Sequence, residues 1–248
     1  MTKKKFKELF RKAGDPGTDT HELDEIIELG NNELCAVVAL NPSCDKYLLD
    51  KLALVNSTHV KNNLAKRYSS YPDLYSINVR EVEISDAEYI FTLRMDDVFN
   101  RYISKVTNDV RAQEEYIEKY LLNNAVERTS FYFILENRLT GVRCGTVRIY
   151  NFDGDVFEWG SWILDGNKTR FAAMETAILI YEFAFNVLGF SRSEFEVNKD
   201  NKKVISYHQK SGAEIIGEDD VNLYFRVSKV VGLNFAKKLR EKLETKHS

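Results

Sequence analysis

Two runs of this chain are the most informative about its fold: Val156-Phe157-Glu158-Trp159-Gly160-Ser161-Trp162-Ile163-Leu164 and Asn201-Lys202-Lys203-Val204-Ile205-Ser206-Tyr207-His208-Gln209-Lys210-Ser211-Gly212-Ala213. The first run is rich in β-branched and aromatic residues, which indicates a strand with one carboxylate in its middle. The second run starts at an asparagine, a residue that caps helix starts. With the residues between them, the two runs predict strand, loop, amphipathic helix, strand and helix, in that order.

The residues on either side extend this alternation of strands and helices. Turn residues at 137–138 and 151–154 separate three consecutive β-rich runs, which predicts an antiparallel meander. The spacing of apolar residues predicts the remaining elements. The expected strands are 74–84, 130–136, 142–150, 156–164, 193–197 and 213–227, and the expected helices are 86–98, 113–122, 172–188, 201–211 and 230–246. This order is typical of a mixed α/β domain.

Up to Pro72 the pattern is different, with short helices separated by turn residues. The phrases at 38–43, 48–53 and 60–65 include Asn41-Pro42 at a helix end and resemble one to two units of the leucine-rich repeat variant, a helical solenoid. A helical cap with chance similarity is the alternative. So short a solenoid cannot cover its own apolar faces, so we expect it to pack on the next domain or on a second copy of the chain, as in a homodimer.

These patterns divide the chain into three parts. The segment 68–73 has turn composition and no periodicity, which marks a linker. We therefore expect a small all-α accessory domain of helical-repeat type over 1–72, the α/β (α+β) domain over 73–228, and a carboxyl-terminal amphipathic helix over 229–248.

The composition argues against several classes of protein but does not identify the function. The 248 residues are 44% hydrophobic, enough to bury a full core, and the net charge of −3 gives no reason to expect nucleic acid. The three cysteines have no CxxC spacing, so neither a disulfide framework nor a metal site is expected, and a reducing cytoplasm fits best. Charged residues interrupt the most apolar window, 172–190, so no membrane span is expected.

The runs 156–164 and 201–213 resemble the GNAT superfamily of acetyl-CoA-dependent N-acetyltransferases. The first run follows the family's strand pattern Glu-x-Gly-x-Trp-Ile, and the second follows its helix pattern Asn-x-x-(small)-Ile-x-x-Tyr-x-Lys-x-Gly-Phe. The resemblance covers roughly 75–228. It implies a GNAT fold, with a mixed, mostly antiparallel sheet flanked by helices, and it implies that the chain is an acyltransferase that uses acetyl-CoA.

The resemblance also implies where acetyl-CoA would bind. The strand backbone at Trp162, Ile163 and Leu164 would pair with the pantetheine arm, and the start of the next helix would face the pyrophosphate. The loop residues implied in this contact are Lys168, Thr169, Arg170, Phe171, Ala172 and Ala173. Relatives usually carry a glycine where Ala172 or Ala173 stands here, and an ordinary helix start after a basic loop is the alternative. Asn201 would bond the pantetheine arm, cap its helix, or do both.

Two residues carry the chemistry in this resemblance. Glu158, flanked by Phe157 and Trp159, stands where many relatives keep a carboxylate beside the acceptor amine, which makes it the expected general base. His208 stands where most relatives have a tyrosine that protonates the departing thiolate, and imidazole can donate a proton near neutral pH. Tyr207 is expected on the wrong face of the helix. The alternatives are a solvated strand glutamate and a surface histidine.

The acceptor would lie against the first helices of the α/β domain. Arg94, Asn100, Arg101 and Lys105 are the candidate contacts, and their cations would suit a nucleotide diphosphate. The region is similar to two GNAT branches, enzymes that acetylate a nucleotide-linked amino sugar in surface-polysaccharide synthesis and ribosomal-protein N-terminal acetyltransferases. We favour the amino sugar, because a peptide acceptor would favour a more acidic cleft. A module that keeps the fold and binds CoA without catalysis is a third reading.

Overall fold

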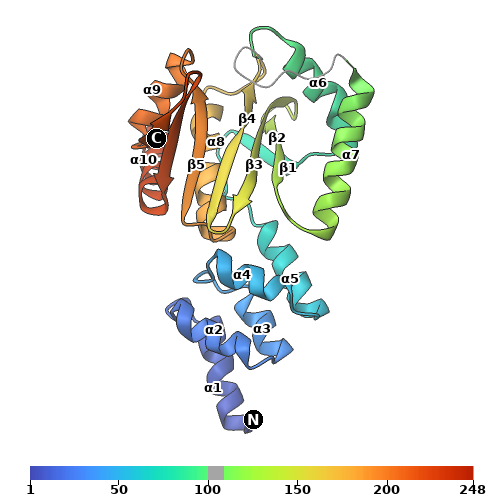
Figure 1. Ribbon diagram of the computed structural model, residues 1–248, viewed down its shortest axis with the longest axis vertical. Helices are drawn as coiled ribbons and strands as arrows, with labels where there is room; N and C mark the ends of the chain where they lie inside the picture. The colour runs from blue at the N-terminus through green and yellow to red at the C-terminus, as the bar shows by residue number, and fades with distance from the viewer. Residues whose placement is uncertain (100–108, 248) are drawn as a thin grey trace. The chain divides into compact units, whose positions relative to one another are not determined.

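The computed structural model describes residues 1–99 and 109–247, and the chain divides into two compact units (Figure 1). The first unit comprises Met1–Pro72 and Glu182–Ser191, and the second comprises Asp73–Tyr181 and Arg192–Ser248. The division after Pro72 lies within the linker that the sequence indicates. The membership of Glu182–Ser191 in the first unit has no signal in the sequence, because the apolar pattern of the helix simply continues there.

Short capped helices build the first unit. Side chains of Thr2, Asp19, Asn31 and Asp45 accept hydrogen bonds from the first turns of their helices, as polar N-cap residues do. The helices are α1 (Lys3–Gly14), α2 (Thr20–Glu28), α3 (Asn32–Val38), α4 (Lys46–Ala53) and α5 (Thr58–Tyr68). Their apolar faces form one buried cluster that includes Leu23, Leu34, Leu48, Leu52 and Val60.

A buried arginine holds this unit together. Arg67 is 6% exposed, and its guanidinium donates hydrogen bonds to four backbone carbonyls, those of Asn41, Cys44, Asn186 and Val187. Burial lowers the pKa of this side chain. Asn186 and Val187 lie in a π-helical turn (Phe183–Val187), so Arg67 connects the amino-terminal helices to the later segment of their own unit.

The second unit is built on one sheet. Within the described residues, seven strands have the order β1-β2-β3-β4-β5-β7-β6. The strands are β1 (Ile77–Glu81), β2 (Phe131–Asn137), β3 (Arg143–Asp153), β4 (Val156–Leu164), β5 (Arg192–Asn198), β6 (Glu214–Glu218) and β7 (Asn222–Ser228). Of the described strands, only β4 and β5 pair in parallel, and the predicted meander of β2, β3 and β4 is confirmed.

One strand prediction is wrong. The run 213–227 is not a single strand but the hairpin of β6 and β7. Asp219 ends the first strand, because its carboxylate accepts hydrogen bonds from the backbone N–H groups of Val221 and Asn222 and so closes a turn.

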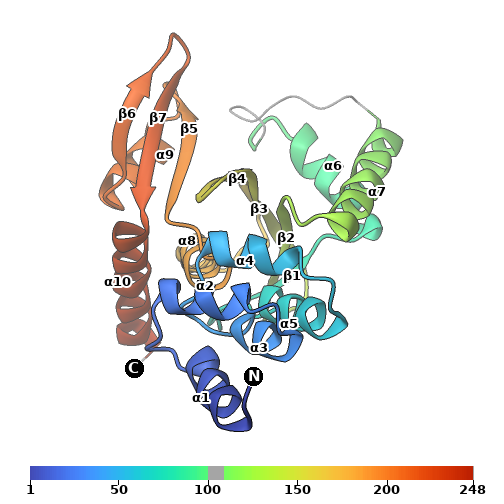
Figure 2. The same cartoon turned by 60° about the horizontal axis from the view of Figure 1, so that its bottom comes forward.

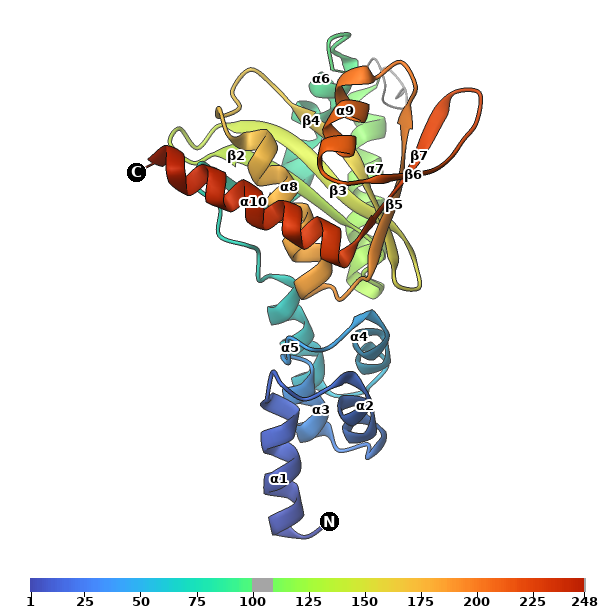
Figure 3. The same cartoon turned by 90° about the vertical axis from the view of Figure 1, so that its left-hand side faces the viewer.

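Helices cover both faces of the sheet (Figures 2 and 3). One face is packed by α6 (Ala87–Met95) and α7 (Val110–Val126), whose apolar residues meet Tyr132 and Ile134 of β2. The other face is packed by α8 (Ala172–Glu182), α9 (Lys202–Lys210) and α10 (Lys229–His247). Since side chains alternate along a strand, neighbours in sequence on β4 belong to different faces.

Among the described residues, no helix is both long enough and apolar enough to cross a membrane.

Candidate active site

The parallel strands β4 and β5 separate soon after they meet. They pair only at Val156 with Arg192 and at Phe157 with Ser193. The rest of β4, from Glu158 to Leu164, continues along β3 while its other edge turns away from β5. The separation leaves two facing strand edges whose backbone groups can pair with an extended ligand, as a strand would.

A bulge in β4 turns both of its tryptophans to the same face. Ser161 has a φ of 49°, and the pairing with β3 shifts register there. The side chains of Trp159 and Trp162, three positions apart, would otherwise alternate, but their ring centroids lie 5.4 Å apart. Trp162 also lies 5.6 Å from the ring of Tyr207, so the bulge brings β4 against α9.

His208 lies where the two strands separate. Its ring centroid is 4.4 Å from that of Phe195 on β5 and 5.4 Å from that of Trp159 on β4. The side chain is buried, with 3% exposure, and its Nδ1 has no hydrogen-bond partner in the described part of the chain. Burial lowers the pKa of His208 to about 4. At neutral pH the imidazole is therefore uncharged, which does not match the predicted donor of a proton near neutrality.

Tyr207 faces the interior as well. Its ring contacts Trp162 and Phe235, the latter on α10 at 6.0 Å between centroids. Its hydroxyl is buried without a hydrogen-bond partner among the residues that the structure describes, and burial raises the pKa of the phenol. The expectation that Tyr207 lies on the wrong helical face is wrong, because consecutive helix positions differ by only about 100° and the interior here surrounds both.

Glu158 points to the opposite face of the sheet from His208. Tyr150 donates a hydrogen bond to its Oε1 at 2.7 Å, and the side-chain amide of Asn151 donates one to its Oε2 at 2.8 Å. The flanking aromatic residues, Phe157 and Trp159, are buried on the other face. The carboxylate is therefore held by two polar donors on β3, and not by the aromatic neighbours that flank it in the sequence.

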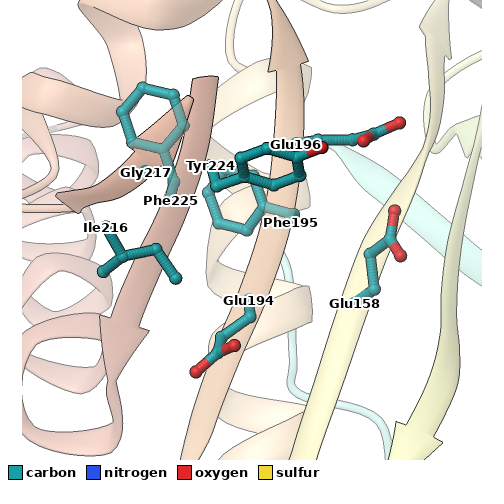
Figure 4. Close-up of a pocket in the computed structure, with 8 residues that line it drawn as sticks. All are labelled: Glu158, Glu194, Phe195, Glu196, Ile216, Gly217, Tyr224 and Phe225. Atoms are coloured by element: carbon teal, nitrogen blue, oxygen red, sulfur yellow. The ribbon is translucent and has the colours of Figure 1, made fainter. Parts of the chain in front are cut away.

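A cavity of about 310 Å³ opens beside Glu158 (Figure 4). Glu158 stands on β4, while Glu194 and Glu196 stand on β5. The remaining lining residues are Phe195, Ile216, Gly217, Tyr224 and Phe225. Glu194 pairs with two arginines on its own side of the sheet, Arg192 at 3.1 Å and Arg226 at 2.8 Å. The cavity is thus rich in carboxylate oxygens and lies at the separation of β4 and β5.

The loop between β4 and α8 carries the predicted contacts for the pyrophosphate. Lys168 donates to the carbonyl of Asp165, the hydroxyl of Thr169 lies 2.6 Å from that of Ser76, and the guanidinium of Arg170 lies over the ring of Phe171. The helix begins at Ala172, which is fully buried, and Ala173 is half-buried. Asn201 caps α9 by accepting a hydrogen bond from the N–H of Val204 at 3.4 Å. Trp162, Ile163 and Leu164 lie at the end of β4.

Of the four predicted acceptor contacts, only Arg94 lies within the described residues, and Asn100, Arg101 and Lys105 lie outside them. Arg94 is on α6, next to Tyr132. Burial raises the pKa of Tyr132 to about 12, and the charges of Arg94 and Arg148 oppose this increase. Arg94 therefore lies on the same face of the sheet as Glu158.

Arg148 on β3 is a cation that the sequence patterns did not indicate. Its guanidinium lies 5.0–5.7 Å from the ring centroids of four tyrosines, Tyr116, Tyr120, Tyr132 and Tyr150, and it donates a hydrogen bond to the hydroxyl of Tyr116. Among the described residues no carboxylate forms an ion pair with it. Rings of this kind stabilise a cation without neutralising it.

Tyr150 and Asn151 were also missed, because a register shift hides them. Counting back from the turn at Gly154 without a bulge places Tyr150 opposite Trp159, on the wrong face. Asn151 has a φ of 51°, and the irregularity there makes Tyr150 pair with Glu158. An asparagine next to a hairpin turn is the signal that could have indicated this bulge, because asparagine tolerates the left-handed region.

Comparison with protein families gives a match for this part of the chain. The model described as "Acetyltransferase (GNAT) domain" matches residues 76–214, more than half of the sequence. A comparison with curated proteins gave no match.

Solved structures extend this finding. The chain is similar to apo FdhC, described as a nucleotide-linked sugar GNAT, with 43% identity and a TM-score of 0.61 over 66% of this chain and 93% of that chain. It is also similar to spermidine N-acetyltransferase from Vibrio cholerae in complex with CoA and spermine, with 16% identity and a TM-score of 0.56 over 64% of this chain and 99% of that chain. A ribosomal-protein-S5-alanine acetyltransferase from Vibrio fischeri has 15% identity and a TM-score of 0.55 over 65% of this chain and 97% of that chain. The last two resemble the chain in fold alone.

Proposed function

The chain belongs to the GNAT acetyltransferase family, and we propose that it transfers an acetyl group from acetyl-CoA to the amino group of a nucleotide-linked amino sugar. The observation that carries this proposal is the 43% identity to a nucleotide-linked sugar GNAT along 93% of that protein. GNAT enzymes are N-acetyltransferases that use acetyl-CoA, so the substrate class is the part that goes beyond the family.

The separated strands support the binding of acetyl-CoA. When bound, this cosubstrate supplies an acetyl thioester. Among the described residues, the edge of β4 from Glu158 to Leu164 has no strand partner on the β5 side, which fits an extended pantetheine arm. The start of α8 and the basic side chains of Lys168 and Arg170 fit the pyrophosphate, since a helix start favours negative charge. Asn201 keeps an amide nitrogen for the arm while its oxygen caps α9.

We assign to Glu158 the role of the general base, which accepts the proton that the acceptor amine loses. The amine nitrogen attacks the thioester carbonyl carbon, the C–N bond forms, and the C–S bond breaks with its electron pair on sulfur. The amine must lose one proton in this sequence, and a carboxylate beside the cavity can accept it. The two hydrogen bonds from β3 fix the direction of the Glu158 carboxylate, which reduces the reorganisation needed during transfer.

We assign the donation of a proton to the departing thiolate to a residue of α9. His208 contacts both Trp159 and Phe195, at the point where the strands separate, which supports the predicted position of the donor. With a pKa of about 4 it is neutral at pH 7, so a proton would come from a neutral ring N–H. The phenol of Tyr207, whose pKa burial raises, keeps its proton at neutral pH and is the second candidate.

Charge supports two different acceptors. Arg148, without a carboxylate partner among the described residues, and Arg94 offer cations on the face of Glu158, which favours an acceptor that carries phosphate. The carboxylates of Glu158, Glu194 and Glu196 around the cavity favour a cationic acceptor, such as a polyamine or a protein amino terminus. An amino-sugar nucleotide carries both a protonatable amine and a diphosphate, so one molecule matches both charges.

A thiol-release assay separates these acceptors. Acetyl-CoA is mixed with the full chain and with each member of a panel of amino-sugar nucleotides, polyamines and short peptides with free amino termini. We expect thiol release with at least one amino-sugar nucleotide, and a higher Michaelis constant for that acceptor in Arg148→Gln, with little change for acetyl-CoA. Release with polyamines or peptides and none with the sugar nucleotides would overturn the assignment.

A further inference from the structure

Two neighbouring residues of β3 hold the carboxylate of Glu158. Tyr150 and Glu158 face each other across the β3–β4 pair, and the hydroxyl donates to Oε1 at 2.7 Å. Asn151 reaches Oε2 at 2.8 Å from a backbone with a φ of 51°. Each carboxylate oxygen thus accepts one hydrogen bond from β3.

Gly160 leaves the space in which the Tyr150 hydroxyl lies. Gly160 and Glu158 are two positions apart on β4 and therefore on the same face. A Cβ added at Gly160 would lie 2.7 Å from the Tyr150 hydroxyl oxygen and 3.5 Å from the nearest ring carbons. The first distance is too short for a carbon–oxygen contact, whereas the second is an ordinary van der Waals contact. A methyl group at this position therefore conflicts with the hydroxyl and not with the ring.

We propose that Tyr150 is a positioning residue for Glu158 and that position 160 is glycine because the Tyr150 hydroxyl lies where a side chain would be. Without Gly160 the hydroxyl moves away from Oε1, and the carboxylate loses the donor that directs it. The inference rests on the proposed function, in which Glu158 takes the proton of the acceptor amine.

Within the described residues, three charged side chains near this pair are Arg148, Glu196 and Glu194. Arg148, also on β3, lies 5.3 Å from the Tyr150 ring centroid, and Glu196 on β5 is close enough to oppose ionisation of the Tyr150 hydroxyl. Glu194 on β5 lines the same cavity but pairs with arginines. The substitutions below leave all three charges in place, so a change in pH dependence reports on the hydrogen bond to Glu158.

A cycle of unfolding measurements tests the space at Gly160 without any substrate. The full chain is compared with Gly160→Ala, Tyr150→Phe and the double variant by thermal denaturation. We expect Gly160→Ala to lower Tm by roughly 2–8 °C in the wild-type background, because a methyl group is forced against the hydroxyl. In the Tyr150→Phe background the same substitution should cost clearly less, since the conflicting oxygen is gone. Equal cost in both backgrounds would overturn the role of Gly160.

Kinetics with acetyl-CoA and the acceptor found in the panel test the positioning role. Tyr150→Phe and Gly160→Ala should each lower kcat about tenfold or more and leave the KM for acetyl-CoA nearly unchanged. The acidic limb of the pH profile should move to higher pH by about one unit, because the charged carboxylate loses a donor. The double variant should be no slower than Tyr150→Phe alone.

Two further variants separate positioning from general damage. Asn151→Gly keeps a backbone that tolerates positive φ but removes the second donor, so it should move the acidic limb in the same direction. Tyr120→Phe removes a different buried hydroxyl, one that bonds the backbone of β2, and should leave the acidic limb in place. An active wild type whose rate and acidic limb are the same in Tyr150→Phe would overturn the inference. A wild type inactive on every amine would instead overturn the proposed function, while the unfolding cycle would still decide the role of Gly160.

Discussion

The buried imidazole of His208 makes the stability of the fold depend on pH. Its pKa is about 4 in the folded protein and about 6.5 when exposed, so between these values the unfolded chain binds the proton more readily. Well above pH 6.5 the imidazole is neutral in both states, and this side chain does not lower the free energy of unfolding. As the pH falls from 6.5 toward 4, protonation of the unfolded chain lowers the free energy of unfolding. From pH 7.5 to pH 5.0, linkage with these two values gives a loss of about 2 kcal/mol from this one side chain.

The substitution His208→Phe isolates the contribution of this imidazole to the pH dependence of stability. Phenylalanine keeps an aromatic ring among Trp159, Phe195 and Phe225 but cannot titrate. The free energy of unfolding is measured by urea denaturation at pH 7.5 and pH 5.0 for both proteins. We expect the wild type to lose about 2 kcal/mol more than the variant over this interval, whatever the absolute stability of the variant is.

His21→Gln serves as the control, because the side chain of His21 is 84% exposed and its loss should leave the pH dependence as in the wild type. An identical pH dependence in the wild type and in His208→Phe would show that burial does not keep His208 neutral. The neutral state matters for function, since it decides whether α9 offers an imidazolium or only uncharged donors.

Other substitutions test the remaining contacts by their cost in free energy of unfolding. Arg67→Met should cost at least about 3 kcal/mol, because four carbonyls lose a charged donor, and Arg67→Lys should recover only part of it. Ser161→Gly should be tolerated at the positive φ of the β4 bulge, whereas Ser161→Val should cost about 1–2 kcal/mol. Glu175→Ala should lower the free energy of unfolding clearly more than Glu175→Gln. This buried carboxylate accepts hydrogen bonds from the backbone N–H groups of Tyr75 and Ser76, and glutamine keeps an acceptor oxygen. Equal urea denaturation curves for the two variants would contradict this.

The sequence predicted the strand 156–164 with the bounds that the structure has, because a long β-branched and aromatic run is a strong local signal. It did not predict which residues face Glu158. Two left-handed residues, Asn151 and Ser161, each shift the pairing by one position, and a shift of one residue moves a side chain to the other face. Register depends on such single residues, which propensity does not resolve.

The helix 201–211 shows the same limit for chemistry. Its start at Asn201 and the position of His208 follow from the motif, and the structure has the helix at Lys202–Lys210. The protonation state of His208 depends on Trp159 and Phe195, which come from two other strands, so the sequence alone could not give it. Arg148 was missed for a similar reason, since its tyrosines come together only when β2, β3 and α7 pack.

We propose that acetyl-CoA binds at the separation of β4 and β5 and that Glu158 takes the acceptor's proton. The most direct test is to measure turnover and acetyl-CoA binding together for the wild type and Glu158→Gln, with calorimetry for binding. We expect wild-type affinity for acetyl-CoA in the variant and a turnover lower by a factor on the order of a hundred or more. Full turnover in Glu158→Gln, or no binding of acetyl-CoA by the wild type, would contradict it.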